Sequence, residues 1–164
     1  NLKRDKLVKK IGVSVYSTHD LMKIVDRFDI DIVQLPVNII NQEILKTGFL
    51  KVLKGKNIEI HARSCFLQGL LLMKYDEIPL KFKKWSNIFM DWHNWLKKNN
   101  INAIQGCLSF INSIDDIDKV VVGTQNVAQL QQLVNYSKNR DIKSFPDLCC
   151  NDANLIDPSN WSSL

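Results

Sequence analysis

The sequence predicts an α/β protein built from parallel strand–helix units, and two observations support this prediction. Short runs rich in β-branched residues alternate with longer amphipathic stretches along the 164-residue chain. The short runs are apolar almost throughout, as strands buried on both faces of a sheet are. Consecutive parallel strands need long crossover connections, and the amphipathic stretches are long enough to supply them as helices.

Four segments are predicted as strands because each is short and rich in Val or Ile. They cover residues 10–15, 30–35, 58–62 and 119–122. Apart from Lys10 and Lys119 at the first positions of two of them, none has the lysines or prolines with which exposed edge strands are commonly protected. We therefore expect each strand to have neighbours, as in part of a barrel or in a sheet completed by a partner.

Five helices are expected between and after these strands, at residues 18–28, 41–53, 83–98, 102–111 and 126–136. Ser17 or Thr18 is the expected N-cap of the first helix. Gly48 is expected to break the second helix, or Gly55 to close it. The aromatic residues at helical spacing in the third predict a stripe packed into the core.

The whole chain, residues 1–164, is predicted to be one domain. Its tail, from about residue 141, is expected to run as a loop over the end of the fold where the strands terminate, and the alternative is a disordered tail. Trp161 is expected to dock there. The four strands are compatible with a small open sheet of the flavodoxin-like kind, or with four of the eight strands of a (β/α)₈ barrel. In both cases ligands bind at the carboxyl ends of the strands.

Cysteine and histidine spacing argues against disulfides and metal sites. Cys149 and Cys150 are adjacent and cannot readily bridge each other, and no CxxC pair occurs. His19, His61 and His93 lie far apart without a second ligand at helical spacing. We therefore expect reduced thiols, a cytoplasmic protein and no bound metal.

Charge and hydropathy argue against two classes of partner. The net charge is +5, but the lysines are spread along the chain with acidic residues between them, so we expect no nucleic-acid partner. No run of about 20 apolar residues is present, so we expect no membrane span.

The predicted strand ends form an ordered set of motifs: residues 11–17 (IGVSVYS), 32–38 (IVQLPVN), 58–71 (IEIHARSCFLQGLL) and 120–126 (VVVGTQN). In this order and spacing the set resembles strands five to eight of the aldo-keto reductases. Residues 155–161 (LIDPSNW) resemble the tail of a bacterial branch of that family. The resemblance implies the C-terminal half of a TIM barrel, with NADP(H) extended across the carboxyl ends of the strands.

The resemblance also assigns roles near the nicotinamide. Ser14 and Gln34 match positions whose hydroxyl and amide hydrogen-bond the carboxamide, although Val15 replaces the Asn that usually follows the Ser. Arg63 stands where many members place a ring-stacking Tyr, and its guanidinium can lie flat against a ring or pair with pyrophosphate. The alternative for Arg63 is a structural ion pair with an acid such as Glu59.

Two further segments resemble phosphate-binding loops of the family. Ser64, Leu67 and Gly69 match the loop that covers the pyrophosphate, and the alternative is a plain turn. The turn that opens the last helix contains the expected phosphate-binding residues Gly123, Thr124 and Gln125.

The family usually grips the 2′-phosphate of NADP with a Lys and an Arg, and this sequence has Gly123 and Gln129 at those positions. Neither residue offers charge-assisted hydrogen bonds. The cofactor is therefore predicted as NADP or NAD.

Catalysis in the family uses Tyr, Lys, Asp and His from the first half of the barrel, and no matching motif occurs in this sequence. No catalytic residue is therefore predicted, and the chain alone is expected to be inactive. The resemblance implies an oxidoreductase fragment that reduces a small carbonyl substrate once the missing N-terminal half is supplied. The alternative is a self-associating half-barrel that binds a nucleotide without catalysis.

Overall fold

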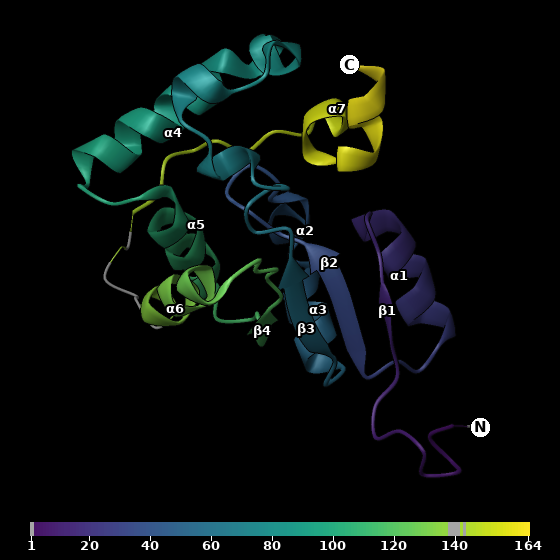
Figure 1. The fold of residues 1–164 in the computed structure, drawn as a ribbon. Helices are drawn as coiled ribbons and strands as arrows, with labels where there is room; N and C mark the ends of the chain where they lie inside the picture. Colours follow the sequence, from purple (N-terminus) through teal and green to yellow (C-terminus); the bar gives the residue numbers. More distant parts are fainter. Residues whose placement is uncertain (1, 138–141, 143) are drawn as a thin grey trace.

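The chain forms a four-stranded parallel sheet with the strand order β1-β2-β3-β4. The computed structural model describes residues 2–137, 142 and 144–164. The strands are β1 (Gly12–Ser14), β2 (Ile32–Pro36), β3 (Glu59–Arg63) and β4 (Lys119–Val120). Figure 1 shows them side by side in the order of the sequence.

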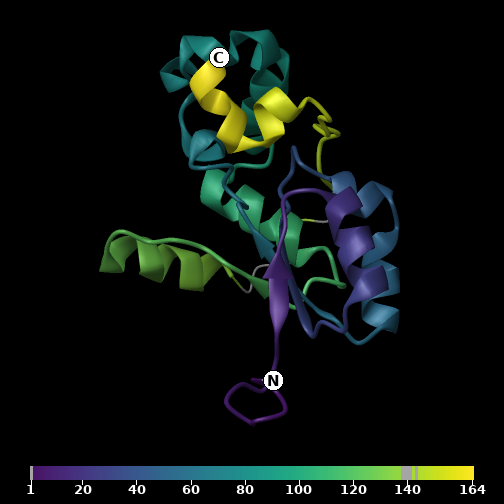
Figure 2. The same cartoon turned by 90° about the vertical axis from the view of Figure 1, so that its right-hand side faces the viewer.

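Every crossover connection in this sheet runs in the same direction. Because parallel crossovers are right-handed, a sequential strand order places all connecting helices on one face. Figure 2, with β1 in front, shows α1 (Thr18–Arg27) and α3 (Phe49–Gly55) together on one side. A doubly wound, flavodoxin-like sheet needs a reversal in strand order, so that alternative is excluded.

All four predicted strands are confirmed, and a helix occurs in each of the five predicted helical segments. Besides α1 and α3, the helices are α2 (Glu43–Lys46), α4 (Ser86–Lys98), α5 (Ala103–Asn112), α6 (Val127–Tyr136) and α7 (Ala153–Ile156). Ser17 caps α1 by accepting a hydrogen bond from the Asp20 amide at 3.1 Å. The predicted second helix is divided at Gly48, which has a φ of 67°.

Burial along the strands distinguishes two faces of the sheet. Val33 and Leu35 of β2 are buried, as are Ile60 and Ala62 of β3. The alternate residues of β3, Glu59, His61 and Arg63, are only partly buried. The helices therefore cover the apolar face, while a polar face stays uncovered.

The sheet of this chain has two free edges, as a barrel fragment or a sheet completed by a partner would have. The sheet is open, with β1 and β4 at its two edges. Gly12 and Ser14 of β1 are exposed, and so is Lys119 of β4.

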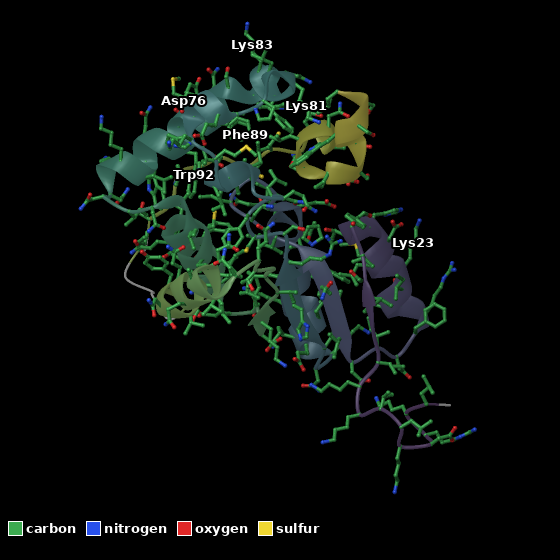
Figure 3. The ribbon with its side chains drawn as sticks, viewed as in Figure 1. Lys23, Asp76, Lys81, Lys83, Phe89 and Trp92 are labelled. Atoms are coloured by element: carbon green, nitrogen blue, oxygen red, sulfur yellow. The ribbon has the colours of Figure 1, made fainter. Side chains whose placement is uncertain are left out.

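The long segment between β3 and α4 lies at the carboxyl end of the sheet (Figure 1), and its buried residues join the same hydrophobic core. It contains three 3₁₀ turns, Leu70–Leu72, Tyr75–Glu77 and Leu80–Trp85, followed by α4. As predicted, the aromatic residues of α4 pack into the core. Figure 3 shows Phe89 and Trp92 on the inner side of α4, with Lys83 pointing away. The Trp92 Nε1 donates to the Leu71 carbonyl at 3.0 Å, and the Trp92 ring stacks on Trp95.

The tail differs from the predicted loop, and the expected start at residue 141 lies outside the described residues. It contains α7 and a 3₁₀ turn, Pro158–Ser163. Asp152 caps α7 and Asp157 caps the 3₁₀ turn, each by accepting a backbone amide hydrogen bond. Trp161 docks as expected, since its ring lies 4.9 Å from that of Phe82. Figure 1 shows this tail beside the α4 segment, at the end of the sheet opposite the N-terminus.

A charge cluster crosses the uncovered face near the amino ends of the strands. Glu59 of β3 accepts hydrogen bonds from Lys10, from Lys119 at 2.9 Å and from His61 at 2.7 Å. The hydrogen bond from Lys10 is the largest of the effects that lower the pKa of the Glu59 carboxyl well below its usual range. Since Lys10 precedes β1 and Lys119 begins β4, one carboxylate links both edges to the centre.

We expect the Glu59 carboxylate to contribute to stability at neutral pH and to lose that contribution in acid. A lowered pKa stabilises the folded state above the unfolded-state pKa, and protonation removes the effect as pH falls below about 4.5. Glu59→Gln should therefore flatten the acid-side fall in unfolding free energy, measured by urea unfolding from pH 6 to pH 3. Glu77→Gln, in an exposed pair with Lys74, is the control and should leave the slope unchanged.

Two helical glycines give a matched test of packing. A Cβ at Gly106 of α5 would lie 2.7 Å from the Trp92 ring and 2.9 Å from Leu96, whereas one at Gly55 of α3 meets nothing within 4 Å. We expect Gly106→Ala to destabilise the fold by about 1–3 kcal/mol and Gly55→Ala to be neutral or stabilising by up to about 1 kcal/mol. Urea unfolding measures both, and equal effects would contradict the packing of α4 on α5.

Candidate functional site

The predicted site residues begin with a polar pair on the first two strands. Ser14 and Gln34 are register partners on β1 and β2. The Ser14 hydroxyl donates to the Gln34 side-chain oxygen at 3.3 Å. Ser14 is exposed and Gln34 is partly buried, both on the uncovered face. The two groups are therefore adjacent, as the predicted carboxamide contacts require.

Arg63 connects the ends of β1 and β3. Its guanidinium donates to the Val15 carbonyl at 3.1 Å and to the Ser64 hydroxyl at 3.3 Å. It also lies 4.1 Å from the centre of the Tyr16 ring. The alternative of an ion pair with Glu59 is wrong: four residues of strand place the two about 13 Å apart along the strand, and Glu59 has other partners.

Tyr16 was missed by sequence reasoning as a component of this site. Tyr16 is 63% exposed, and its ring stacks on Arg63. An aromatic residue directly after a predicted strand was the available signal, but its guanidinium partner lies 47 positions further along the sequence. Together the two groups present a flat surface at the carboxyl end of the sheet.

The loop after β3 has an unusual backbone. Ser64, Leu67, Gln68 and Gly69 all have positive φ, at 57°, 47°, 54° and 87°. The Leu67 amide donates to the Ser64 carbonyl at 2.9 Å, and its side chain is fully buried. Leu67 therefore belongs to the core, as does the buried Cys65, whereas Gln68 in the same tight turn is exposed.

A cavity of about 570 Å³ lies between this loop and the turn after β4. Of the ten predicted site residues, six line it: Ser64, Gly69, Gly123, Thr124, Gln125 and Gln129. Its apolar walls include Phe66, Leu72, Ile104, Val121, Val122 and Leu133. Ser14, Gln34, Arg63 and Leu67 do not line it. The volume is within the usual range for small-molecule sites, and the mixed lining can hold a flat ring and a polar ribose.

The N-terminus of α6 borders the cavity and is capped by side chains. The Gln129 amide donates to the Asn126 side-chain oxygen at 2.9 Å. The Gln129 side-chain oxygen in turn accepts from the Gln125 amide at 2.8 Å. Gln129 thus folds back over the helix end, where a phosphate would otherwise find free amides.

Cys65 is a further cavity residue that sequence reasoning did not select. Burial raises the pKa of its thiol to about 12, so the thiol is neutral at physiological pH. Its burial could not be predicted from the sequence, because it depends on how distant parts of the chain pack around the loop.

Residues 2–137, 142 and 144–164 contain neither a cluster of metal ligands nor a helix that could span a membrane. No group of three or more His, Cys, Asp or Glu side chains is placed there to hold a metal ion. None of the helices in the same ranges is long and apolar enough to cross a bilayer.

Comparison with known proteins gives a family. Residues 1–146 match the model of the aldo/keto reductase family. A search of curated proteins found no match.

Solved structures of the same family have a similar fold. An aldo-keto reductase from Bacillus halodurans in its holo form is 12% identical, with a TM-score of 0.64, over 87% of this chain and 49% of its own. A thermostable aldo-keto reductase in complex with the inhibitor epalrestat is 17% identical, with a TM-score of 0.58, over 90% and 48%. A glycerol dehydrogenase from Gluconobacter oxydans is 13% identical, with a TM-score of 0.54, over 88% and 55%. The chain thus spans about half the length of the structures it resembles.

The environment of Cys65 predicts slow thiol chemistry. A thiol with a pKa near 12 is ionised to about one part in 10⁴ at pH 8, against roughly a quarter for an ordinary thiol. We expect Cys65 to react with iodoacetamide at least about 100-fold more slowly than the half-buried Cys149, as measured by peptide mass spectrometry. Unfolding in guanidinium should equalise the rates, and equal rates in the folded protein would contradict the burial of Cys65.

Proposed function

The chain belongs to the aldo/keto reductase family, and we propose that it is the nucleotide-binding half of an NAD(P)H-dependent reductase of carbonyl compounds. The ordered strand-end motifs support its assignment to strands five to eight of the barrel, residues 1–164 forming one domain. The cavity between the loop after β3 and the turn after β4 is the main support for nucleotide binding, because six predicted residues surround one space.

The chemical character of the site fits a dinucleotide. The apolar wall of the cavity suits a purine ring, and Ser64, Thr124 and Gln125 offer hydrogen bonds to a ribose. Arg63, bonded to Ser64, is a cation beside the cavity that suits a pyrophosphate. Further along the strand ends, Ser14 and Gln34 offer a hydroxyl and an amide to a carboxamide.

In the proposed reaction the bound nicotinamide nucleotide supplies the hydride. Ser14 and Gln34 would determine which face of the nicotinamide ring meets the substrate, because their polar groups fix the carboxamide. The flat surface of Tyr16 and Arg63 would shield that end of the site from water. These residues bind and orient, and none of them is assigned the transfer of a proton to the carbonyl oxygen.

The proton donor is proposed to come from the missing N-terminal half. The sheet of this chain has two open edges, β1 and β4. The outer side of α6 is apolar and uncovered, with Val127, Leu130 and Val134 80%, 49% and 52% exposed. Four further strand–helix units would pair with both edges and cover this helix.

Self-association is the second candidate, supported by the same open edges and the same face of α6. Two copies could close both edges by two-fold symmetry and bind nucleotides without reduction. Light scattering separates the two candidates, since a stable dimer of this chain supports self-association and a monomer supports completion by the missing half.

Nucleotide binding can be tested on the chain as it stands. Titration with NADH and NADPH, followed by nicotinamide fluorescence, should give saturable binding. No oxidation of the bound nucleotide is expected on addition of small aldehydes, because the proton donor is proposed to lie in the other half of the barrel. Oxidation by the chain alone would contradict the proposed division of roles.

A substitution that fills the cavity tests whether the nucleotide binds there, with the same substitution outside the cavity as its control. Thr124→Trp places an indole in the cavity from an exposed position and should weaken nucleotide binding at least about tenfold, as the loss of well-packed contacts does. Gln131→Trp adds the same ring to α6 outside the cavity and should leave the affinity unchanged. Equal effects of the two substitutions would show that the nucleotide binds elsewhere.

A further inference from the structure

Among the described residues, no charged side chain lines the cavity. The lining residues at the α6 end are Gly123, Thr124, Gln125 and Gln129, all neutral. Within the part of the chain that the structure describes, the rest of the lining is also free of Lys, Arg, His, Asp and Glu. A ligand group that carries a full charge would lose water there without receiving an ion-pair partner.

The N-terminus of α6 would compensate the charge of a bound anion only weakly. A helix N-terminus is equivalent to about half a positive charge, whereas a phosphate monoester carries close to two negative charges at neutral pH. The amides of Gln125 and Gln129 are already bonded to side-chain oxygens within the same turn. An anion at this position would have to displace the Gln129 side chain.

The opposite end of the cavity is different. Ser64 lines the wall and accepts a hydrogen bond from the guanidinium of Arg63 at 3.3 Å. A cation is therefore available beside the loop after β3 and not in the wall near α6. This distribution suits a ligand with its anionic part near Arg63 and a neutral, hydroxyl-bearing part near Gln129.

We infer that the site selects NAD(H) over NADP(H), an inference that rests on the proposed function. The two nucleotides differ only at the 2′ position of the adenosine ribose, which is a hydroxyl in NAD(H) and a phosphate in NADP(H). A free 2′-hydroxyl can hydrogen-bond the neutral side chains of Thr124 and Gln129. A 2′-phosphate would lie in a wall without cations.

The test compares the dissociation constants of NADH and NADPH for the unmodified chain by nicotinamide fluorescence. We expect NADH to bind at least about tenfold more tightly than NADPH. The 2′-phosphate of NADPH would lose hydrogen bonds to water without gaining any from a cationic side chain, and hydrogen bonds to charged groups typically change affinity by this factor or more. Raising the salt concentration should change the affinity for NADPH and for NADH to a similar extent, because no cation pairs with the 2′ position.

Variants that supply the missing cations should reverse the preference. Gly123 has room for a side chain, because a Cβ there meets nothing within 4 Å. Gly123→Lys with Gln129→Arg should shift the ratio of the two dissociation constants toward NADPH at least about tenfold and make NADPH binding weaken more steeply with salt. Gln131→Arg adds one positive charge on the opposite side of α6, outside the cavity, and should leave the ratio unchanged.

Failure of the inference is distinguishable from failure of the proposed function. If both nucleotides bind and NADPH binds as tightly as NADH or more tightly, the inference is wrong and the proposed function stands. If neither binds while the chain is folded by circular dichroism, the proposed function is wrong and the inference fails with it. A ratio that Gln131→Arg shifts as much as the double variant would also overturn the inference.

Discussion

The sequential pairing of four parallel strands is the constraint on which the rest of this structure depends. Because the order never reverses, all crossover helices fall on one face and all strand–helix loops that can bind a ligand fall on one edge. Both ends of β3 contribute to this arrangement. Its amino end contributes Glu59, which links both sheet edges, and its carboxyl end contributes Arg63 and the loop that borders the cavity.

Local sequence patterns were sufficient to predict the four strands and the helical segments from α1 to α6. Apolar runs predicted all four strands, helical periodicity predicted α1 and α4, and Gly48 predicted the division between α2 and α3. The tail was predicted less well. Its α7 is only four residues long, and it is held by distant contacts such as Lys84 to Asp152 at 2.8 Å and Trp161 on Phe82. Such contacts leave no periodic pattern in the sequence.

The candidate site was predictable to the extent that it follows strand ends. Six residues from two segments about 60 positions apart meet at one cavity, as the parallel arrangement requires. What sequence did not predict depends on side chains that cross between strands. Arg63 reaches the end of β1 and Tyr16 instead of Glu59, and Gln129 turns back onto its own helix end. These contacts are decided by geometry within a few ångströms, which motif spacing does not specify.

The salt bridges of Glu59 have a consequence for the lifetime of an unpartnered copy. Lysines on edge strands commonly act as gatekeepers against strand-to-strand aggregation. In this chain Lys10 and Lys119 lie at the two edges, but both ammonium groups turn inward to one carboxylate on the central strand. The two side chains remain 51% and 64% exposed, but their charges are paired with Glu59. Under the proposed function, a copy that lacks the other half of the barrel would have both edges open to pairing, and its lifetime in the cell should therefore depend on the supply of that half.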